Sequence, residues 1–245
     1  RRSSALRAYR YAVPDEWYTK YHVRRYGFHG TSHRYVTLRA AEALGKSVDK
    51  VNLITCHLGN GCSMTAVAGG KAVDHSMGMT PLEGLVMGTR SGDIDPAIVT
   101  YMVSHGMSVE QVDRELNKKS GLVGLSKLSN DMRDLLTARD EGDLAAKLAV
   151  DVFVYRLVKY IGAYAVVLPG LDAIVMTGGI GENSLPVRSM LCEQLAPLGV
   201  KGDEERNQKT WRGAAGPITS DSSRLPVCGS RCGRQSMGGQ RRGSS

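Results

Sequence analysis

The segment VNLITCHLGNGCSMTAVAGGKAVDH, residues 51–75, predicts three consecutive β-strands joined by two glycine turns. Residues 51–58 form an apolar run that ends at Gly59-Asn60-Gly61. Asn-Gly is a strong hairpin signal because both residue types tolerate positive φ. The alternating residues 63–67 complete the hairpin, and Gly69-Gly70 turns the chain into a third short strand over 71–75.

Helical and strand patterns alternate on either side of this meander. A helix is predicted over 32–44, with Thr31 or Ser32 as N-cap and Gly45 as its stop, and further helices over 109–117 and 144–166. A buried strand over 171–176 runs into the glycine-rich turn 177–183, from which another helix leads toward Leu195. These elements predict an α/β fold with a mixed sheet flanked by helices.

Composition separates the body of the chain from its two ends. The net charge is +8, but four arginines lie in residues 1–13 and five in residues 222–245, which leaves the body close to neutral. We therefore expect no nucleic-acid partner. The predicted organisation is an atypical N-terminal segment 1–13, a main domain 14–224, and a basic Gly/Ser/Arg tail 225–245 that we expect to be disordered.

The cellular compartment is predicted from apolar runs and cysteines. No apolar run reaches the roughly 18 to 20 residues of a membrane helix, and the first residues lack the apolar core of a secretory signal. The five cysteines form no CxxC pair, which is typical of reduced thiols. We expect a cytoplasmic protein with no membrane partner.

Two glycine-rich turns directly follow apolar strands, at 57–61 and 178–183. A backbone without Cβ atoms can approach an anion closely, and successive N–H groups present partial positive charge to it. Both turns therefore suit phosphate binding, although each on its own is also compatible with a plain tight turn. The common GxxxxGK[ST] and GxGxxG fingerprints are not present in the sequence.

Two further polar segments carry candidate catalytic groups. Arg90, in Met87 to Pro96, lies between glycines, from which a guanidinium can clamp a phosphoryl or carboxylate group. Asp93 and Asp95 either hold a metal or cap the helix that starts at Pro96, and we favour capping. His29, in the segment 24–33, either donates a hydrogen bond to an anionic transition state or serves as a structural histidine. A metal pair with His33 is disfavoured because Gly30 stands where a zinc protease has Glu.

Together these segments resemble the acetate kinase family of the acetate and sugar kinase, Hsp70 and actin superfamily. The resemblance rests on residues 25–33, 55–61, 78–96 and 177–184, in the family's order and spacing, and runs from about Ala8 to about Arg224. It implies an actin-like, ribonuclease H-like ATPase domain. It also implies reversible phosphoryl transfer from ATP to acetate, giving acetyl phosphate and ADP, with Mg²⁺ as cofactor.

The resemblance assigns roles position by position. His29 resembles the histidine that stabilises the transferring phosphoryl group, Arg90 the arginine that orients the carboxylate, and Phe28 a residue of the acetate pocket. The remaining implied contacts are with ATP. They comprise the phosphate turn His57, Leu58, Gly59, Asn60 and Gly61, the nucleoside neighbours Asp131, Met132 and Arg133, and the adenosine-binding residues Gly179, Ile180, Gly181, Glu182 and Asn183.

The chain also departs from the family pattern at both ends. The family has an additional N-terminal domain and a catalytic aspartate just upstream of the matching region, whereas Arg1 to Arg7 contains no aspartate. A glutamate that serves magnesium is expected near the C-terminus, where this chain reads 225–231 instead. We expect an incomplete fragment with little or no activity alone, and homodimerisation by analogy with the family. The alternatives are a nucleotide-binding remnant without catalysis and a propionate or butyrate kinase relative.

Overall fold

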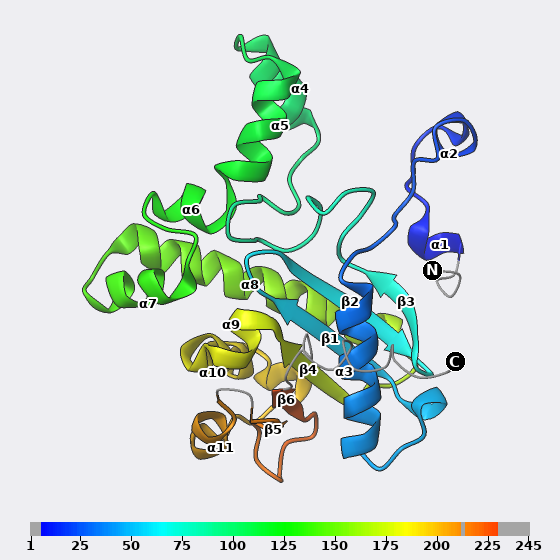
Figure 1. Ribbon diagram of the computed structural model, residues 1–245, viewed down its shortest axis with the longest axis vertical. Coiled ribbons are helices and arrows are strands. Elements are labelled where there is room, and N and C mark those ends of the chain that lie inside the picture. The colour runs from blue at the N-terminus through cyan, green and yellow to red at the C-terminus, as the bar shows by residue number, and fades with distance from the viewer. Residues whose placement is uncertain (1–5, 212–213, 230–245) are drawn as a thin grey trace, which may run out of the picture.

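A six-stranded mixed sheet forms the centre of the protein in a computed structural model that describes residues 6–211 and 214–229 (Figure 1). The strand order is β3-β2-β1-β4-β6-β5. β1 pairs in antiparallel fashion with β2 and in parallel with β4, and β4 pairs in parallel with β6. The strands are β1 Leu53–Leu58, β2 Cys62–Ala68, β3 Lys71–His75, β4 Ala173–Thr177, β5 Gly216–Pro217 and β6 Val227–Gly229.

Helices cover both faces of this sheet, with α3 on one face and α8 on the other (Figure 1). α4 and α5 project away from the sheet at the top of the view. The α-helices are α1 Leu6–Tyr9, α2 Asp15–Thr19, α3 Gly30–Ala43, α4 Ala97–Ser104, α5 Val109–Lys118, α6 Gly121–Ser126, α7 Met132–Asp140, α8 Leu144–Val167, α9 Gly178–Asn183, α10 Leu185–Gln194 and α11 Glu204–Lys209. Two 3₁₀ turns are η1 Val48–Lys50 and η2 Ala196–Leu198.

The two faces of the sheet differ in chemistry. Toward α8 the strands present Ile54, Cys56 and Leu58, which belong to a large apolar cluster with α7, α8 and α10. Because strand side chains alternate between faces, the neighbouring residues point the other way. The face under α3 is apolar near the start of β1 and polar near its end, where Thr55 and His57 lie. The polar groups therefore collect at the end of the sheet where β1 turns into β2.

The predicted mixed sheet flanked by helices is confirmed, as are the hairpin at Asn60-Gly61 and the third strand over 71–75. The predicted capping of the helix at 32–44 is wrong. α3 begins at Gly30, its N-cap is His29 in the left-handed conformation with φ 57°, and no side chain caps it. Ser32 does not cap because it lies inside the first turn of the helix, where its Oγ is 2.8 Å from His57 Nδ1.

The boundary of the predicted tail at 225 also lies too early. Val227–Gly229 is strand β6, paired with both β4 and β5, and Leu225 is buried. Composition misses this strand because it is three residues long and its hydrogen bonds are made to distant segments. The rest of the predicted tail, 230–245, and residues 1–5 lie outside the described residues.

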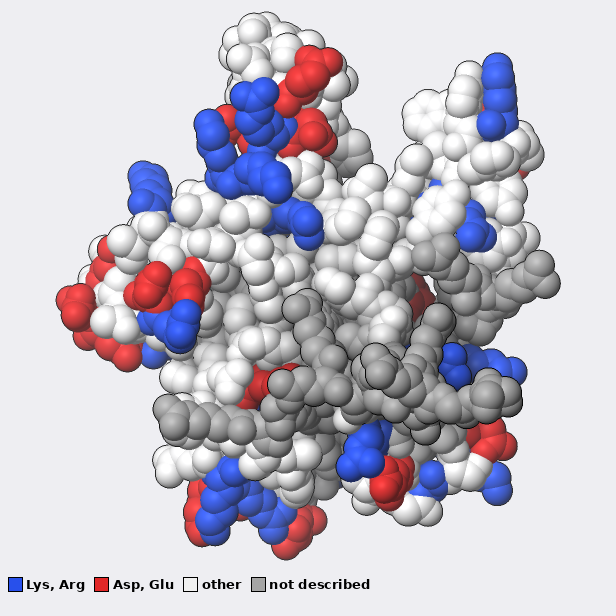
Figure 2. All heavy atoms as spheres, in the orientation of Figure 1, with Lys and Arg blue, Asp and Glu red and all other residues white. Residues whose placement is uncertain are grey.

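Charged side chains of both signs lie together on the face shown in Figure 2, beside one another over α7 and α11. Ion pairs within single helices account for part of this mixing, as between Arg139 and Asp140 at 2.8 Å in α7 and between Lys209 and Glu205 in α11. Over the described residues, every helix is too short or too polar to cross a membrane.

Candidate active site

The two glycine-rich turns lie side by side at one end of the sheet. β1 and β4 are parallel neighbours, with His57 opposite Thr177, so the turns that follow them leave the same edge. Gly178 has φ +82°, and a Cβ there would lie 2.6 Å from the carbonyl oxygen of Leu58. Only glycine allows this approach, because other residues combine strain at positive φ with a clash. The segments 57–61 and 178–183 therefore form one continuous edge of backbone.

The first turn is surrounded by groups from distant segments. A Cβ built on Gly61 would lie 3.5 Å from Arg90 Nη1, 3.5 Å from His29 Cε1 and 3.6 Å from His29 Nε2. One point in space beside the turn is thus within contact distance of a guanidinium and an imidazole. Asn60 is held by Gly88, whose N–H donates to its carbonyl at 3.0 Å, and by Asn130, whose Nδ2 donates to its Oδ1 at 2.9 Å.

His29 is held by its backbone and by a buried serine. It precedes α3 in the left-handed conformation, and its Nδ1 lies 2.9 Å from Ser63 Oγ, so Nε2 remains on the side of Gly61. Burial, followed by the neighbouring His57 and Arg90, lowers the pKa of His29 to about 4. The ring is therefore neutral at physiological pH and can donate only one hydrogen bond.

Arg90 supplies fixed positive charge beside this neutral ring. Its loop is held by Met87 N–H donating to the Arg90 carbonyl at 3.1 Å and by Leu122 N–H donating to Met87 at 2.9 Å. Within the part of the chain that the structure describes, no carboxylate forms an ion pair with Arg90, and its Nη1 donates to Met87 Sδ at 3.8 Å. An unpaired guanidinium beside open glycine backbone suits an anion.

His57 and Phe28 flank His29 on either side. The His57 ring centroid is 4.3 Å from that of His29, and Ser32 holds its Nδ1. The carbonyl of Phe28 accepts a hydrogen bond from His75 Nε2 at 2.7 Å, while its ring is partly buried against the main core. A groove of about 740 Å³ extends from Phe28 and His29 along α3 and β3.

The second turn satisfies its own polar groups. Glu182 Oε1 accepts from Thr177 Oγ1 and from Gly178 N–H, both at 3.0 Å, and Asn183 Nδ2 donates to the Gly179 carbonyl at 3.0 Å. Glu182 is partly engaged in holding this turn. Gly179 is exposed, with open space where a Cβ would stand. Its N-terminal position on α9 leaves the backbone accessible to a ligand.

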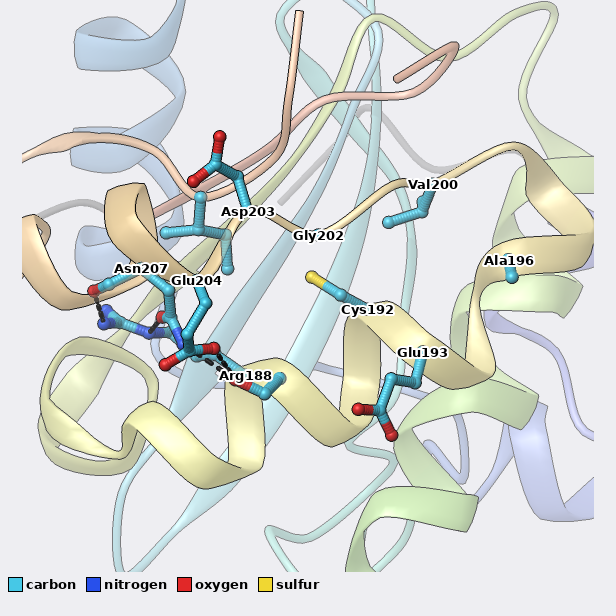
Figure 3. A pocket seen from close by; sticks show the side chains of 11 residues that line it. Arg188, Cys192, Glu193, Ala196, Val200, Gly202, Asp203, Glu204 and Asn207 are labelled. Atoms are coloured by element: carbon cyan, nitrogen blue, oxygen red, sulfur yellow. Dashed lines mark hydrogen bonds between the residues drawn. The ribbon is translucent and has the colours of Figure 1, made fainter. Parts of the chain in front are cut away.

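A buried arginine supports the second turn from behind. Arg188 has no exposed surface; its Nη1 donates to the Glu182 carbonyl at 3.0 Å, and its Nε and Nη2 donate to Asn207 at 2.7 and 2.8 Å. Figure 3 shows Arg188 turned toward Asn207 beside a cavity of about 270 Å³ that Cys192 and Glu204 also line. Because the guanidinium of Arg188 donates to Glu182 and Asn207, its role here is to stabilise the second turn.

The predicted nucleoside neighbours lie at the start of α7. Asp131 caps this helix, its Oδ1 accepting from Arg133 N–H at 2.9 Å, and it also pairs with the Arg133 side chain. Met132 is buried in the core. The segment lies next to the first turn because Asn130, which precedes it, binds Asn60. Of these three side chains, Arg133 is the most exposed, with 89% of its side chain accessible.

The aspartates of the Arg90 loop serve the fold. Asp95 Oδ1 accepts from Ala97 N–H at 2.9 Å at the start of α4, in agreement with the favoured capping role. The favoured capping role is wrong for Asp93, because its carboxylate accepts instead from Gly84 N–H at 2.8 Å and from the Tyr160 hydroxyl at 2.7 Å. Across the described ranges no three His, Cys, Asp or Glu side chains gather as a metal site would require.

Three residues of this region were not singled out by the sequence analysis: Ser63, Thr55 and Asn130. Ser63 and Thr55 share the α3 face of the hairpin, and both are buried. Their signal in the sequence is a polar residue at each position of the strand that alternation predicts to be covered. Asn130 has no comparable signal because its partner, Asn60, is 70 residues away.

Known proteins match this chain over most of its length. The profile of the acetokinase family matches residues 2–234. The acetate kinase of Thermotoga maritima is 56% identical over 223 residues, and that of Bacillus cytotoxicus is 55% identical over 201 residues. These matches cover 90% and 82% of this chain, and 55% and 51% of the relatives.

Solved structures agree. The acetate kinase of Porphyromonas gingivalis superposes with a TM-score of 0.89 at 44% identity, covering 94% of this chain and 57% of the other. A propionate kinase from Francisella tularensis gives 0.89 at 43%, with 94% and 58% coverage. The chain spans about half the length of the curated relatives it matches. The profile match and these identities place it without ambiguity: the chain belongs to the acetokinase family.

Proposed function

We propose that this chain carries the ATP-binding part of an acetate kinase, which transfers a phosphoryl group reversibly from ATP to acetate to give acetyl phosphate and ADP. The observation that carries the proposal is the convergence of His29 and Arg90 on one point beside Gly61. A guanidinium without a carboxylate partner among the described residues and a neutral imidazole, both beside glycine backbone, suit a phosphoryl group whose negative charge is spread over acceptor-only oxygens.

Each part of the site has a role in this proposal. The turn 57–61 receives the phosphates, and the exposed backbone of Gly179 with residues 180–183 borders the adenosine. Arg90 orients the carboxylate and neutralises charge on the transferring group, while His29 donates a hydrogen bond to it. Phe28 lines the pocket of the carboxylate. Phosphoryl transfer depends mainly on positioning and charge neutralisation, which these groups provide.

Magnesium is the cofactor that the family resemblance implies. The described residues do not fit a protein-built magnesium site, because Asp93 and Asp95 are engaged with the backbone and Tyr160 and no other acidic cluster lies at the turns within those residues. Mg²⁺ is commonly carried by substrate phosphates and water. No step of this proposal is routed through the metal.

The choice of carboxylate is open between two close substrates. The chain resembles an acetate kinase and a propionate kinase almost equally, at 44% and 43% identity and the same TM-score. We propose acetate because the relatives compared at 50% identity or more are acetate kinases. We also propose a cytoplasmic location, consistent with the free thiols of Cys56, Cys62, Cys192 and Cys228, and a homodimer.

The test is ATP binding by calorimetry on the chain and on Arg90→Ala. ATP affinity is expected to fall at least tenfold in Arg90→Ala, since a charge-assisted contact is lost. Arg114→Ala, which removes an exposed arginine from α5, serves as the matched control and should bind as the parent chain does. Equal affinity in all three proteins would contradict the proposal.

Turnover is measured separately as acetyl phosphate captured by hydroxylamine. Acetyl phosphate that disappears in Arg90→Ala supports catalysis by this chain. ATP binding without acetyl phosphate instead supports the alternative of a nucleotide-binding remnant.

A further inference from the structure

A row of hydrogen bonds runs from the buried sheet to His29. Thr55 Oγ1 lies 2.8 Å from His33 Nδ1, His33 Nε2 lies 2.7 Å from Ser63 Oγ, and Ser63 Oγ lies 2.9 Å from His29 Nδ1. Thr55 and Ser63 have no exposed surface and His33 only 4%. The row is shielded from water, so its members must satisfy one another.

The donor and acceptor roles in this row are coupled, so that reversing one hydrogen bond reverses the others. A neutral imidazole has one donor and one acceptor nitrogen, and a hydroxyl has one hydrogen to donate. If Thr55 donates to His33, then His33 donates from Nε2 to Ser63. Ser63 then donates to Nδ1 of His29, whose own hydrogen must sit on Nε2. If every bond is reversed, His29 donates from Nδ1 and Nε2 carries a bare lone pair.

Both imidazoles are neutral, so the direction of the hydrogen bonds decides which nitrogen of His29 carries its hydrogen. Burial is the first cause that lowers the pKa of His29 to about 4 and the pKa of His33 well below its ordinary value, and neighbouring histidines add to it. His29 therefore cannot donate from both nitrogens at once at neutral pH. Its Nε2 is the nitrogen on the side of Gly61 and Arg90.

An anion beside Gly61 distinguishes the two arrangements. Phosphoryl and carboxylate oxygens only accept hydrogen bonds, so a bare Nε2 facing them is repelled and an Nε2–H is attracted. The reversed arrangement gains one further bond, from Thr55 Oγ1 to the Thr65 carbonyl, but at 3.5 Å this is at the limit of hydrogen bonding. The hydrogen bond from His29 Nε2 to a bound anion is therefore expected to stabilise the first arrangement by more than the Thr55 bond stabilises the reversed one.

We propose that Ser63, with His33 and Thr55 behind it, is a positioning residue that places the proton of His29 on Nε2 when an anion lies beside Gly61. Ser63 accepts from His33 and donates its single hydrogen to His29, so the imidazole presents N–H to the phosphoryl group without becoming charged. The identity of this anion as the phosphoryl group of ATP rests on the proposed function. The coupling of the two rings through Ser63 does not.

The experiment is nitrogen-15 NMR of the imidazole rings, which distinguishes a protonated from a bare ring nitrogen. The chain is measured at neutral pH, free and saturated with ATP, together with Ser63→Ala. With ATP, His29 of the parent chain is expected to carry its hydrogen on Nε2. In Ser63→Ala the nitrogen signals of His29 and His33 should both shift in the free chain, and ATP affinity should fall about tenfold.

Thr65→Val is the matched control. Thr65 lies two residues along the same strand and is buried, and its hydroxyl has no partner among the described residues. The Thr65→Val variant should show the same His29 and His33 nitrogen signals as the parent chain. If Ser63→Ala does not fold, Ser63→Cys keeps the size and replaces the hydroxyl by a weak thiol donor, and the same shifts are expected.

Two results would overturn the inference. One is a hydrogen on Nδ1 of His29 in the ATP complex; the other is a Ser63 variant in which the His29 signals match those of the parent chain. A chain that binds no ATP at all contradicts the proposed function instead, and the coupling is then decided by the free-state spectra of the Ser63 and Thr65 variants.

Discussion

The two glycine-rich turns occupy the same edge of the sheet but are built in opposite ways. The 178–183 turn is closed by its own side chains, since Glu182 binds Gly178 N–H and Arg188 holds the Glu182 carbonyl. The 57–61 turn is instead surrounded by groups from elsewhere, with His29 and Arg90 beside Gly61. A glycine-rich sequence is thus held by nearby residues of its own segment in one place and bordered by groups from distant segments in the other.

The largest effect is expected at Gly178, where the two turns meet. Gly178→Ala forces a Cβ into positive φ and to within 2.6 Å of the Leu58 carbonyl, so the free energy of unfolding should fall by about 3 kcal/mol. Gly179→Ala is the control, because open space surrounds its Cβ position and alanine favours the helix. Urea denaturation of both variants measures the difference. Equal stability would show that the turns do not support each other.

An intermediate effect, on binding rather than stability, is expected at Gly61. In Gly61→Ala the new methyl is in ordinary contact with Arg90 and His29 at 3.5 Å, so the free energy of unfolding should change by no more than about 0.5 kcal/mol. The methyl occupies the space proposed for the phosphoryl group, and ATP affinity should fall at least tenfold. Calorimetry measures this, with Gly162→Ala in α8 as control, where nothing lies near the Cβ position. Unchanged affinity would place the anion elsewhere.

The smallest effect at neutral pH comes from three imidazoles that α3 and β3 contribute. Burial lowers the pKa of His29 and of His75 to about 4, and lowers that of His33 as well. Each folded pKa is below the ordinary value of about 6.5, so the unfolded chain takes up these protons first. The contribution of these imidazoles to stability is therefore expected to be constant above about pH 7 and to fall as the pH drops from 6.5 toward 4.

Histidine NMR signals and urea denaturation across this range test the expectation. The His29 signals should titrate with a midpoint near 4. A midpoint near 6.5 would mean that the first turn is open to water and that its imidazole is charged at physiological pH.

Much of the fold could be predicted because its signals are local. The meander over 51–75 follows from alternation and turn residues, and the long helix over 144–166 from its apolar spacing. Strand β6 could not be predicted in this way, because a three-residue strand is stabilised by partners such as Ile174 that lie far away in the sequence. The start of α3 was misplaced because His29 adopts positive φ, for which its sequence gives no signal.

The residue types of the candidate site could be proposed from the sequence, but the hydrogen bonds between those residues could not. Glycine turns after strands, a guanidinium between glycines and a histidine at a helix start point to an anion site on chemical grounds alone. Ser63, which is hydrogen-bonded to His29, and His33 behind it are brought together by the pairing of β1 with β2 and by the docking of α3. Such contacts depend on tertiary structure, so only the folded chain reveals them.

The parallel pairing of β1 with β4 also has a consequence for how the molecule is assembled. Asn52 and Asp172 at the start of this pair are 120 residues apart in sequence, so the ladder closes a long loop. Closing such a loop costs entropy before its contacts form, and contacts of high sequence separation slow folding. During synthesis, the hairpin of β1 and β2 therefore emerges well before its parallel neighbour, and the two glycine-rich turns can come together only after residue 178 has left the ribosome.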